Sequence, residues 1–585
     1  MEKSHPILDL TNEAIARLST FFSRLKTNGK SWLSSFVKRN RDNLITLAWL
    51  TIVAILIFGY TLICYNFTIP LSGDGYLQSQ TMPYQMYDQW HRFFNTGHFS
   101  LWDSSTGLGV NTIGADSFYG LFSPFTLITL IFPRSWIPQE IAILYIVKIV
   151  LGGFFFYLYL RMFNISVGSR RIGGVAFAFC GWVTYYLWFA FYLDAFAFFP
   201  LILYGIEKVI QERDPRLLIV AFFLVGLSNY FFLAVFMIGS CLYSIFRYIQ
   251  CWKQMKTSET RWAVFGMGVT CFLLGILLSA FVLLPSIMNV KSMPRINESS
   301  YLDDLMNAFK SNDLNKIFKV LFQFDYSSEY ISYRKIYPLN SLVFMNLASF
   351  SNNLLQVSYY DNLSGSSYIF VPLLLMTFVG YLYAFKKKRI GTIIGGFFTI
   401  FFMSVPFFYY LFSAFTVGYA RFYLLPISWM IAFACKTIDE RREISRGYLD
   451  ASMAILVILQ ITAYVLSIWA INNQYILYKD GYPFADETWW ERLLILPFQF
   501  GIDIVGYVVM RHFFHGKKFN KATLLLVSIE AIAMGNTVIL NHGFGDISNL
   551  EYSNGQGNRI VSNETNLISK LKEYDSSIYR VFNST

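Results

Sequence analysis

The 585-residue sequence has few charged residues and no recognisable cysteine pattern. Only 14% of its residues are Asp, Glu, Lys or Arg, whereas about 25% is usual in soluble proteins, so an ordinary soluble domain is excluded. The six cysteines have no paired spacing and lie in or beside apolar runs, which predicts neither a disulfide framework nor a zinc site. The sequence also lacks an internal repeat, a low-complexity segment and a Gly/Ser-rich linker.

Apolar and aromatic residues are abundant instead. The chain is 55% hydrophobic and contains 59 Phe and 39 Tyr, a composition that excludes disorder. A helix needs about 20 apolar residues to cross a bilayer. Segments of this kind are predicted at 44–66, 139–163, 172–192, 195–211, 262–285, 367–385, 391–412, 420–437, 448–470, 492–511 and 522–541. The first begins too late and is too long for a cleaved signal peptide, so it is a retained helix.

The apolar stretch 217–250 requires a separate interpretation. A single helix would place Arg216 and Arg247 on opposite sides of the membrane, although basic residues concentrate on the cytoplasmic side. We therefore predict a hairpin of two short helices, broken near Ser228 and Asn229. Interrupted helices are tolerated where they line a cavity.

The net charge of +11 and the pI near 9.1 could suggest a nucleic-acid partner. The basic residues, however, cluster in the short segments between the predicted spans, and an N-terminus inside the cell places every cluster in the cytoplasm. The excess charge therefore predicts orientation in the membrane and contact with membrane lipids, and no nucleic-acid partner. These clusters are the N-terminal arm, 170–171, 208–216, 247–261, 386–389, 436–446 and 511–521.

The predicted fold is an all-α polytopic membrane protein with about 13 transmembrane helices and large extracytoplasmic loops. Residues 1–43 form a basic cytoplasmic arm, 44–541 the transmembrane domain and 542–585 an extracytoplasmic tail. Within the transmembrane domain, we expect the outer loop 67–138 to be catalytic. The outer loop 286–366 is expected to contact substrate or the membrane interface, because it contains amphipathic and apolar stretches.

The loop 67–138 combines glycines, carboxylates and indoles. Glycines permit sharp turns and close approach of a ligand, while carboxylates can accept hydroxyl hydrogen bonds or remove a proton. This composition is typical of a pocket for a polar substrate such as a sugar. The alternative is that the tryptophans form an interfacial belt and the acids are solvated. The main segments are Ser72 to Gln78, Asp88 to Arg92, Trp102-Asp103, Gly107 to Asn111 and Gly114 to Asp116.

The order of these motifs resembles that of the YfhO family, within the GT-C superfamily of membrane glycosyltransferases. The resemblance covers essentially the whole chain, but each motif is short. It is carried by Gly73-Asp74 followed by Gln78, by Trp90, Trp102 and Gly107-x-Gly109-x-Asn111, by the segment Asp194 to Glu207, by Ser228-Asn229-Tyr230, and by Gly418 to Phe422. Family members commonly continue into a longer extracytoplasmic domain. The chain is therefore expected to be either a short member or one truncated before that domain.

The resemblance implies a GT-C-like bundle and an inverting transfer of a sugar from a polyprenyl (undecaprenyl) phosphate donor. The implied acceptor is an envelope glycopolymer such as lipoteichoic or wall teichoic acid, at the outer face of the cell membrane. An upstream glycosyltransferase that charges the lipid and a flippase would supply the donor.

Asp74 is the residue that the resemblance implies as the catalytic carboxylate. It lies about one turn beyond the first predicted span and would orient or deprotonate the acceptor hydroxyl. An Asx turn or helix cap beside Gly73 and Gly75 is the alternative interpretation. The residues expected to bind the sugar or the acceptor are Gln78, Trp102, Asp103, Asn111, Asp116 and Asp194.

The leaving phosphate requires a cation on the outer side. Arg421 is the sharpest candidate, because it begins a span away from the cytoplasmic clusters, and Lys291 and Arg295 follow it. A guanidinium can bind phosphate oxygens in a bidentate manner, although each of these residues could instead extend to lipid headgroups.

No cofactor is implied with certainty. The alternative is a magnesium or manganese ion held by two carboxylates, for example those of Asp74 and Asp194. Lys148, Asp503 and Glu530 lie within spans, where ionisable residues either pair between helices or serve transport. A flippase or other transporter of lipid-linked sugars, or a non-catalytic envelope protein, is therefore the alternative to an enzyme.

Overall fold

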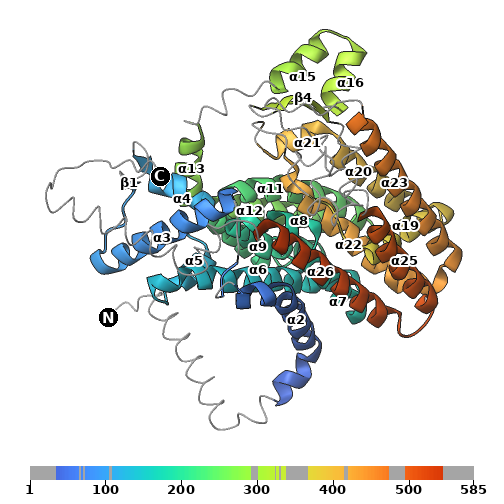
Figure 1. The fold of residues 1–585 in the computed structure, drawn as a ribbon. Helices are drawn as coiled ribbons and strands as arrows, with labels where there is room; N and C mark the ends of the chain where they lie inside the picture. The colour runs from blue at the N-terminus through green and yellow to red at the C-terminus, as the bar shows by residue number, and fades with distance from the viewer. Residues whose placement is uncertain are drawn as a thin grey trace.

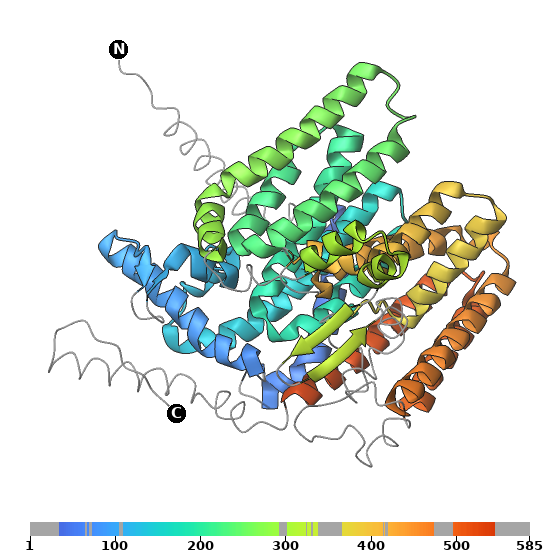
Figure 2. The ribbon, with the colours of Figure 1, turned by 90° about the horizontal axis from the view of Figure 1, so that it is seen from above.

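The computed structural model is a helical bundle (Figures 1 and 2). The structure describes residues 34–64, 67–69, 73–103, 109–291, 301–322, 324–328, 331–336, 366–413, 415, 419–472 and 495–543. The predicted arm before residue 34, the apolar stretch 339–357 and most of the tail lie outside these ranges.

Helices account for most of the described chain. The first half contains α2 (Arg41–Cys64), α3 (Gly73–Thr96), α4 (Thr112–Asp116), α5 (Pro124–Thr129), α6 (Ile137–Tyr159), α7 (Val167–Ala178), α8 (Gly181–Tyr185), α9 (Ala190–Glu212), α10 (Arg216–Ser228), α11 (Tyr230–Cys251), α12 (Ser258–Leu278) and α13 (Ala280–Lys291). The second half contains α15 (Tyr301–Lys310), α16 (Leu314–Phe322), α19 (Val371–Lys386), α20 (Ile390–Ser404), α21 (Pro406–Leu411), α22 (Leu424–Glu440), α23 (Arg446–Asn472), α25 (Ile495–Phe513) and α26 (Phe519–Gly543).

Two small antiparallel ladders accompany the helices. Strand β1 (Trp102–Asp103) pairs with β2 (Val110–Asn111), and β3 (Phe324–Ser328) pairs with β4 (Ile331–Ile336). The architecture is therefore the predicted all-α bundle with small additions outside it.

The core lies where α6, α7 and α9 pack together. Phe177 stacks on Phe156 with ring centroids 4.3 Å apart and on Phe196 at 5.0 Å. A Cβ atom added at Gly153 would lie 2.7 Å from the carbonyl oxygen of Gly174, so the absence of side chains lets α6 and α7 approach closely. This packing fixes α6 and α9, which carry Lys148 and Asp194.

Five helical segments among the described residues are long and apolar enough to cross a membrane. The sequence and the structure therefore agree on a membrane protein. These segments are Arg41–Cys64, Arg134–Phe163, Tyr230–Cys251, Ser258–Leu278 and Ala420–Glu443, and shorter apolar helices stand beside them at Arg216–Ser228, Ala280–Lys291, Val371–Lys386 and Ile390–Ser404.

The stretch 217–250 forms the predicted hairpin. Helix α10 ends at Ser228, and Asn229 caps α11 by accepting a hydrogen bond from the backbone N–H of Phe232 at 3.1 Å. Near the other end of α11, Arg247 pairs with Glu207 of α9 at 2.6 Å, while Arg216 at the start of α10 pairs with Asp214, just beyond α9. Both ends of the stretch therefore lie at the same end of α9.

The basic clusters meet at this same end of the bundle, here called the basic end. Interhelical ion pairs link them there, with N–O distances of 2.7 Å for Arg171 to Asp42, 2.7 Å for Arg389 to Glu440 and 2.9 Å for Arg511 to Asp450. The segments that the charge pattern assigned to one side of the membrane are thus gathered at one end of the fold. Their cytoplasmic orientation stays a prediction.

Three predicted spans are not continuous helices. Segment 172–192 divides after α7, where the N–H of Gly181 donates to the carbonyl of Tyr368 at 2.9 Å. Segment 262–285 divides at Ser279, between α12 and α13. Segment 391–412 divides at Val405, which adopts extended backbone angles because the residue before a proline, here Pro406, is disfavoured in the helical region.

The outer region 67–138 is more helical than a glycine-rich loop would suggest. Its first described element, α3, spans Gly73–Thr96 and contains Asp74 in its first turn. Arg134 holds this helix through two hydrogen bonds to the carboxylate of Asp88, at 2.8 and 2.9 Å. Trp90 adds a bond of 2.8 Å from its indole N–H to the carbonyl of Leu121. The candidate catalytic residue is thus carried by a long helix that is fixed at its far end.

Replacement of Asn229 is expected to loosen the hairpin. Asn229 is fully buried; its amide N–H donates to the carbonyl of Phe118 at 2.7 Å and its amide oxygen caps α11. Asn229→Ala leaves these partners unsatisfied, so we expect a loss of roughly 1–3 kcal/mol in stability. Thermal unfolding of the purified chain in detergent measures this loss, with the half-buried Asn40→Ala as the control. Equal melting temperatures of the two variants would contradict the assignment.

Candidate functional site

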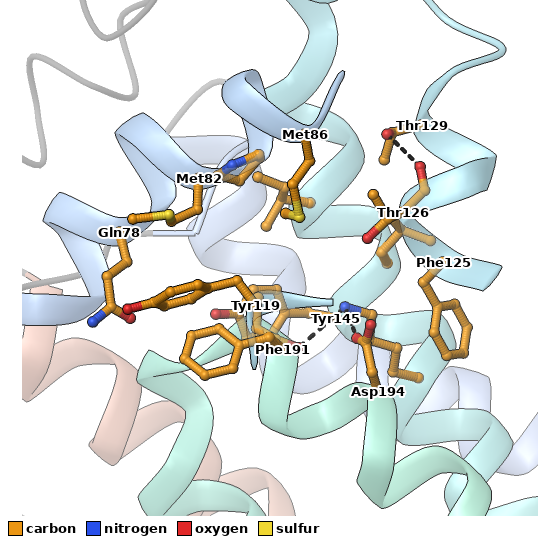
Figure 3. A pocket seen from close by; sticks show the side chains of 15 residues that line it. Gln78, Met82, Met86, Tyr119, Phe125, Thr126, Thr129, Tyr145, Phe191 and Asp194 are labelled. Atoms are coloured by element: carbon orange, nitrogen blue, oxygen red, sulfur yellow. Dashed lines mark hydrogen bonds and ion pairs between the residues drawn. The ribbon is translucent and has the colours of Figure 1, made fainter. Parts of the chain in front are cut away.

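A mostly apolar pocket with a few polar groups in its wall lies at the end of the bundle opposite the basic end. It has a volume of about 70 Å³, which is room for a few water molecules. Figure 3 shows Gln78, Met82 and Met86 of α3 on one side of the pocket, with Phe125, Thr126 and Asp194 on the other.

An ion pair forms one wall of this pocket. The ammonium of Lys148, on α6, contacts the carboxylate of Asp194, on α9, and donates to the carbonyl of Ala190 at 3.1 Å. Both side chains are buried, with 7% and 3% of their surface exposed. Of the two alternatives left open for Lys148, the structure shows the interhelical pair. Removal of one partner of such a pair leaves an uncompensated buried charge.

The same pocket contains polar atoms that have no partner. The hydroxyl of Tyr145, a fully buried residue, and the amide oxygen of Gln78 make no hydrogen bond in the described part of the chain. The hydroxyl could donate or accept a hydrogen bond, whereas the amide oxygen could only accept one. A small polar group that enters the pocket would therefore contact Tyr145, Gln78 and the Lys148–Asp194 pair.

Helix α3 brings the predicted residues to this pocket. Gln78, Met82 and Met86 are spaced by four residues, so they share one face of the helix, and all three line the pocket. Asp74 precedes Gln78 by four residues, which is about one helical turn; its side chain lies outside the described part of the structure. The structure thus places Gln78, one turn after Asp74, at the pocket.

A second group of predicted residues meets around Gln85. Its amide N–H group donates to Asp103 at 2.8 Å and to Asp116 at 3.5 Å. Asp116 is only 3% exposed. Burial raises the pKa of Asp116 to about 7, and the neighbouring charge of Asp103 adds to the rise. Near neutral pH the two carboxyl groups can therefore share one negative charge, as close pairs of acids do.

The elevated pKa of Asp116 predicts how stability depends on pH. The folded chain binds this proton more tightly than the unfolded chain, whose Asp titrates near pH 4. The contribution to stability is therefore complete below about pH 4 and is lost as pH rises through about 7. We expect Asp116→Asn to remove this loss, which amounts to roughly 2–4 kcal/mol.

Melting temperatures of the wild type and Asp116→Asn between pH 4 and 8 check this expectation. The exposed residue Asp303 on α15 provides the control variant, Asp303→Asn, which should keep the pH dependence of the wild type. The same pH dependence in all three proteins would contradict it.

Asn111 and Trp102 shape the surroundings of this acid pair. The amide oxygen of Asn111 caps α4 by accepting from the N–H of Gly114 at 2.7 Å, so Asn111 positions the helix that carries Asp116. Trp102 is 59% exposed, and its ring covers Gly109, whose φ of +100° and lack of a side chain permit this contact. Neither residue lines the pocket; Trp102 offers an exposed ring face.

Arg421 lies among aromatic rings. Its guanidinium carbon is 4.9 Å from the ring centre of Tyr419, 5.1 Å from that of Phe231 and 5.6 Å from that of Tyr192. Rings at these distances attract a cation. No carboxylate pairs with Arg421 among the described residues, and its Nε atom is buried without a hydrogen-bond partner. A half-buried guanidinium with unused donors is a ready site for an anion.

The aromatic surroundings of Arg421 adjoin the pocket. On α9, Phe191 lines the pocket while the next residue, Tyr192, contacts Arg421. Phe118 contacts the rings of both residues, at 5.3 and 6.2 Å. Consecutive residues of α9 thus contact the pocket and the guanidinium of Arg421.

The remaining predicted cations are not brought to this pocket. Lys291 ends α13 and is exposed, and Arg295 lies outside the described residues. The two other ionisable residues of the spans have polar partners on neighbouring helices. Asp503 accepts from Gln460 of α23, and Glu530 accepts from Tyr368 and from the N–H of Val371, the latter at 3.2 Å.

The described residues offer little to a metal ion. Within them, no group of three or more His, Cys, Asp or Glu side chains could hold one. The amide of Gln85 already bridges the carboxylates of Asp103 and Asp116, and the ammonium of Lys148 already neutralises Asp194. The carboxylates of Asp103, Asp116 and Asp194 therefore already contact hydrogen-bond donors of the protein itself.

Two residues of this region were missed by the sequence analysis. Gln85 is seven residues after Gln78, two turns along the same helix, so recognition of α3 as a helix would have pointed to it. Tyr145 precedes Lys148 by three residues on α6 and faces the same pocket. Within an apolar run, a single tyrosine carries no signal of its own.

Comparisons with known proteins show what this chain is similar to. The family described as bacterial membrane protein YfhO matches residues 46–333. A Bacillus subtilis (strain 168) protein described as uncharacterized protein YfhO is 23% identical over 426 residues, which cover 69% of this chain and 42% of that protein. The chain thus spans less than half the length of the curated relative that it matches.

One solved structure shows a weaker likeness. The crystal structure of ArnT from Cupriavidus metallidurans bound to undecaprenyl phosphate has a TM-score of 0.43 and 10% sequence identity. The match covers 85% of this chain and 76% of that chain.

Proposed function

We propose that the chain, whose residues 46–333 match the family described as bacterial membrane protein YfhO, is a member of that family and a GT-C-like inverting glycosyltransferase. Its donor would be a sugar on polyprenyl (undecaprenyl) phosphate. Its acceptor would be an extracytoplasmic envelope glycopolymer such as lipoteichoic or wall teichoic acid. An upstream glycosyltransferase and a flippase would provide the donor at the outer leaflet.

The observation that carries this proposal is the position of Arg421. It is a cation with no carboxylate partner among the described residues, and it stands beside the pocket that Gln78 and Asp194 line. Transfer from a lipid phosphate needs this combination, because negative charge develops on the leaving phosphate while a hydroxyl loses its proton. In this proposal Arg421 would meet the first requirement and Asp74 the second.

The proposed reaction assigns one role at the acceptor hydroxyl and another at the leaving phosphate. The acceptor oxygen forms a bond to the anomeric carbon as the bond from that carbon to the phosphate oxygen breaks, so the anomeric configuration inverts. Asp74 takes the proton of the acceptor hydroxyl. The polyprenyl phosphate leaves with the bonding electron pair, and Arg421 stabilises its charge through bidentate hydrogen bonds. A lipid phosphate is a good leaving group, so a cation is needed more than a general acid.

The residues around the pocket would hold the sugar. Gln78 and Tyr145 each have a polar atom without a hydrogen-bond partner among the described residues, which suits sugar hydroxyls. The Lys148–Asp194 pair would keep α6 and α9 in register behind them. Asp103 and Asp116 would face the acceptor, with the exposed ring of Trp102 as a surface on which a sugar can stack.

Purified chain in detergent provides the test. It is incubated with a polyprenyl-phosphate sugar radiolabelled in the sugar and with candidate glycopolymer acceptors. We expect the label to appear on the acceptor and unlabelled polyprenyl phosphate to accumulate in equal amount. An intact donor after incubation with every acceptor class would favour the alternative, a flippase or a non-catalytic envelope protein.

A further inference from the structure

A second, larger cavity lies at the basic end of the bundle, far from the candidate active site. It has a volume of about 320 Å³, within the range of roughly 300–1,000 Å³ that small-molecule sites occupy. Its walls come from the ends of α6, α11, α20 and α22 that meet there. Aromatic rings dominate the lining, with Phe246, Phe398 and Trp429 among them. Phe246 and Phe398 are both exposed.

This cavity is here called the apolar groove. A second pocket at the basic end, here called the polar pocket, is continuous with it. The two share Phe163, Arg247 and Gln250, and the polar pocket has a volume of about 460 Å³. Asn164, Gln211, Gln250 and Gln254 furnish it with amide groups. Amides both donate and accept hydrogen bonds, so this part suits a headgroup with uncharged hydroxyls, whereas the aromatic part suits a hydrocarbon chain.

Lys436 supplies the cation at the groove. Arg247, which also lines it, is neutralised by Glu207 through bonds of 2.6 and 2.8 Å. Lys436 is 48% exposed, and its nearest carboxylate oxygen, on Glu440, is 4.0 Å away. Exposed ion pairs at this distance contribute little to stability, so Lys436 remains available to an external anion.

We propose that this groove binds an anionic glycerophospholipid of the leaflet at the basic end. One acyl chain lies between α11 and α20, the phosphodiester contacts Lys436, and the headgroup hydroxyls reach the amides of the polar pocket. The sequence predicts that this end faces the cytoplasm, where membranes carry anionic lipid, and basic pockets between helices bind such headgroups. The site differs in place and ligand from the proposed donor site.

Glycines on α20 permit a direct test. A Cβ atom at Gly395 would make only an ordinary contact with Phe246, at 3.6 Å, so Gly395→Leu extends into the groove without displacing the backbone. Gly266 on α12 is a matched control because nothing lies within 4 Å of an added Cβ and it does not line the groove. Lys436→Gln tests the headgroup contact, with Lys387→Gln as its control.

The full chain is purified in detergent and titrated with phosphatidylglycerol or phosphatidylcholine, and bound lipid is counted by native mass spectrometry. We expect the wild type, Gly266→Leu and Lys387→Gln to prefer phosphatidylglycerol. Gly395→Leu should bind it about tenfold more weakly, through loss of chain burial. Lys436→Gln should lose about fivefold in affinity for phosphatidylglycerol and retain its affinity for phosphatidylcholine.

Three results would overturn the proposal. They are equal binding of the two lipids by the wild type, equal binding of phosphatidylglycerol by Gly395→Leu and Gly266→Leu, and an unchanged lipid preference in Lys436→Gln. Gel filtration of each variant shows that the chain is folded. If Gly395→Leu does not fold, the two lysine variants decide the outcome.

Discussion

Asp74→Asn is expected to abolish sugar transfer while the chain still folds and inserts into the membrane. An amide has nearly the size of the carboxylate but cannot accept the proton of the acceptor hydroxyl. Loss of a positioned general base costs about 10²- to 10⁴-fold in rate. Transfer of radiolabelled sugar by the purified variant measures the loss, and donor binding should persist because the phosphate contact is made elsewhere.

Asp88→Asn is the control for this variant. Asp88 lies on the same helix, α3, but its carboxylate is bound by Arg134, so its replacement should affect stability more than transfer. Transfer by Asp74→Asn at the wild-type rate would eliminate Asp74 as the base. Its position at the start of α3 would then be explained by helix formation alone.

Arg421→Ala is expected to reduce use of the donor by about 100-fold. Charge-assisted hydrogen bonds contribute roughly 1.5–3 kcal/mol each, and a bidentate contact would lose two of them. Arg421→Lys keeps the charge but not the fork of donors, so we expect a smaller loss of about tenfold. The ratio kcat/KM for the polyprenyl-phosphate sugar measures both effects.

A structural role of Arg421 would give a different pattern. The rings of Tyr192, Phe231 and Tyr419 stabilise the guanidinium, so both variants should lower the melting temperature slightly. Arg389→Ala, at the basic end, controls for the loss of an exposed arginine. Equal losses of activity in Arg421→Ala and Arg421→Lys, in step with their melting temperatures, would show that Arg421 acts through folding alone.

Much of the bundle could be predicted because an apolar segment in a bilayer must satisfy its own backbone hydrogen bonds, which a helix does. The hairpin at 217–250 followed from Arg216 and Arg247, because basic residues at both ends of an apolar stretch favour the same side of the membrane. The breaks at Ser279 and Val405 could not be predicted from apolar content, since hydrophobicity continues through them. Only the proline after Val405 carried a local signal.

The candidate site also contains residues that the sequence predicted and contacts that it could not predict. Gln78 and Asp194 were named because they belong to motifs that carry the family resemblance, and the structure brings them to one pocket. The residues around Arg421 come from three separate segments, and their meeting depends on the packing of α9, α11 and the turn before α22. Gln85 was missed because the glycines near Asp74 suggested a loop in place of α3. Tertiary contacts of this kind leave no trace in local sequence.

Transfer in sealed vesicles tests the central claim most directly. The protein is reconstituted with the labelled donor in the membrane, and the acceptor is supplied on one side at a time. We predict labelled glycopolymer only when the acceptor is on the side of the pocket end of the bundle, and none with Asp74→Asn. Labelled donor that crosses the membrane without any transfer to the acceptor would contradict the account and identify a transporter.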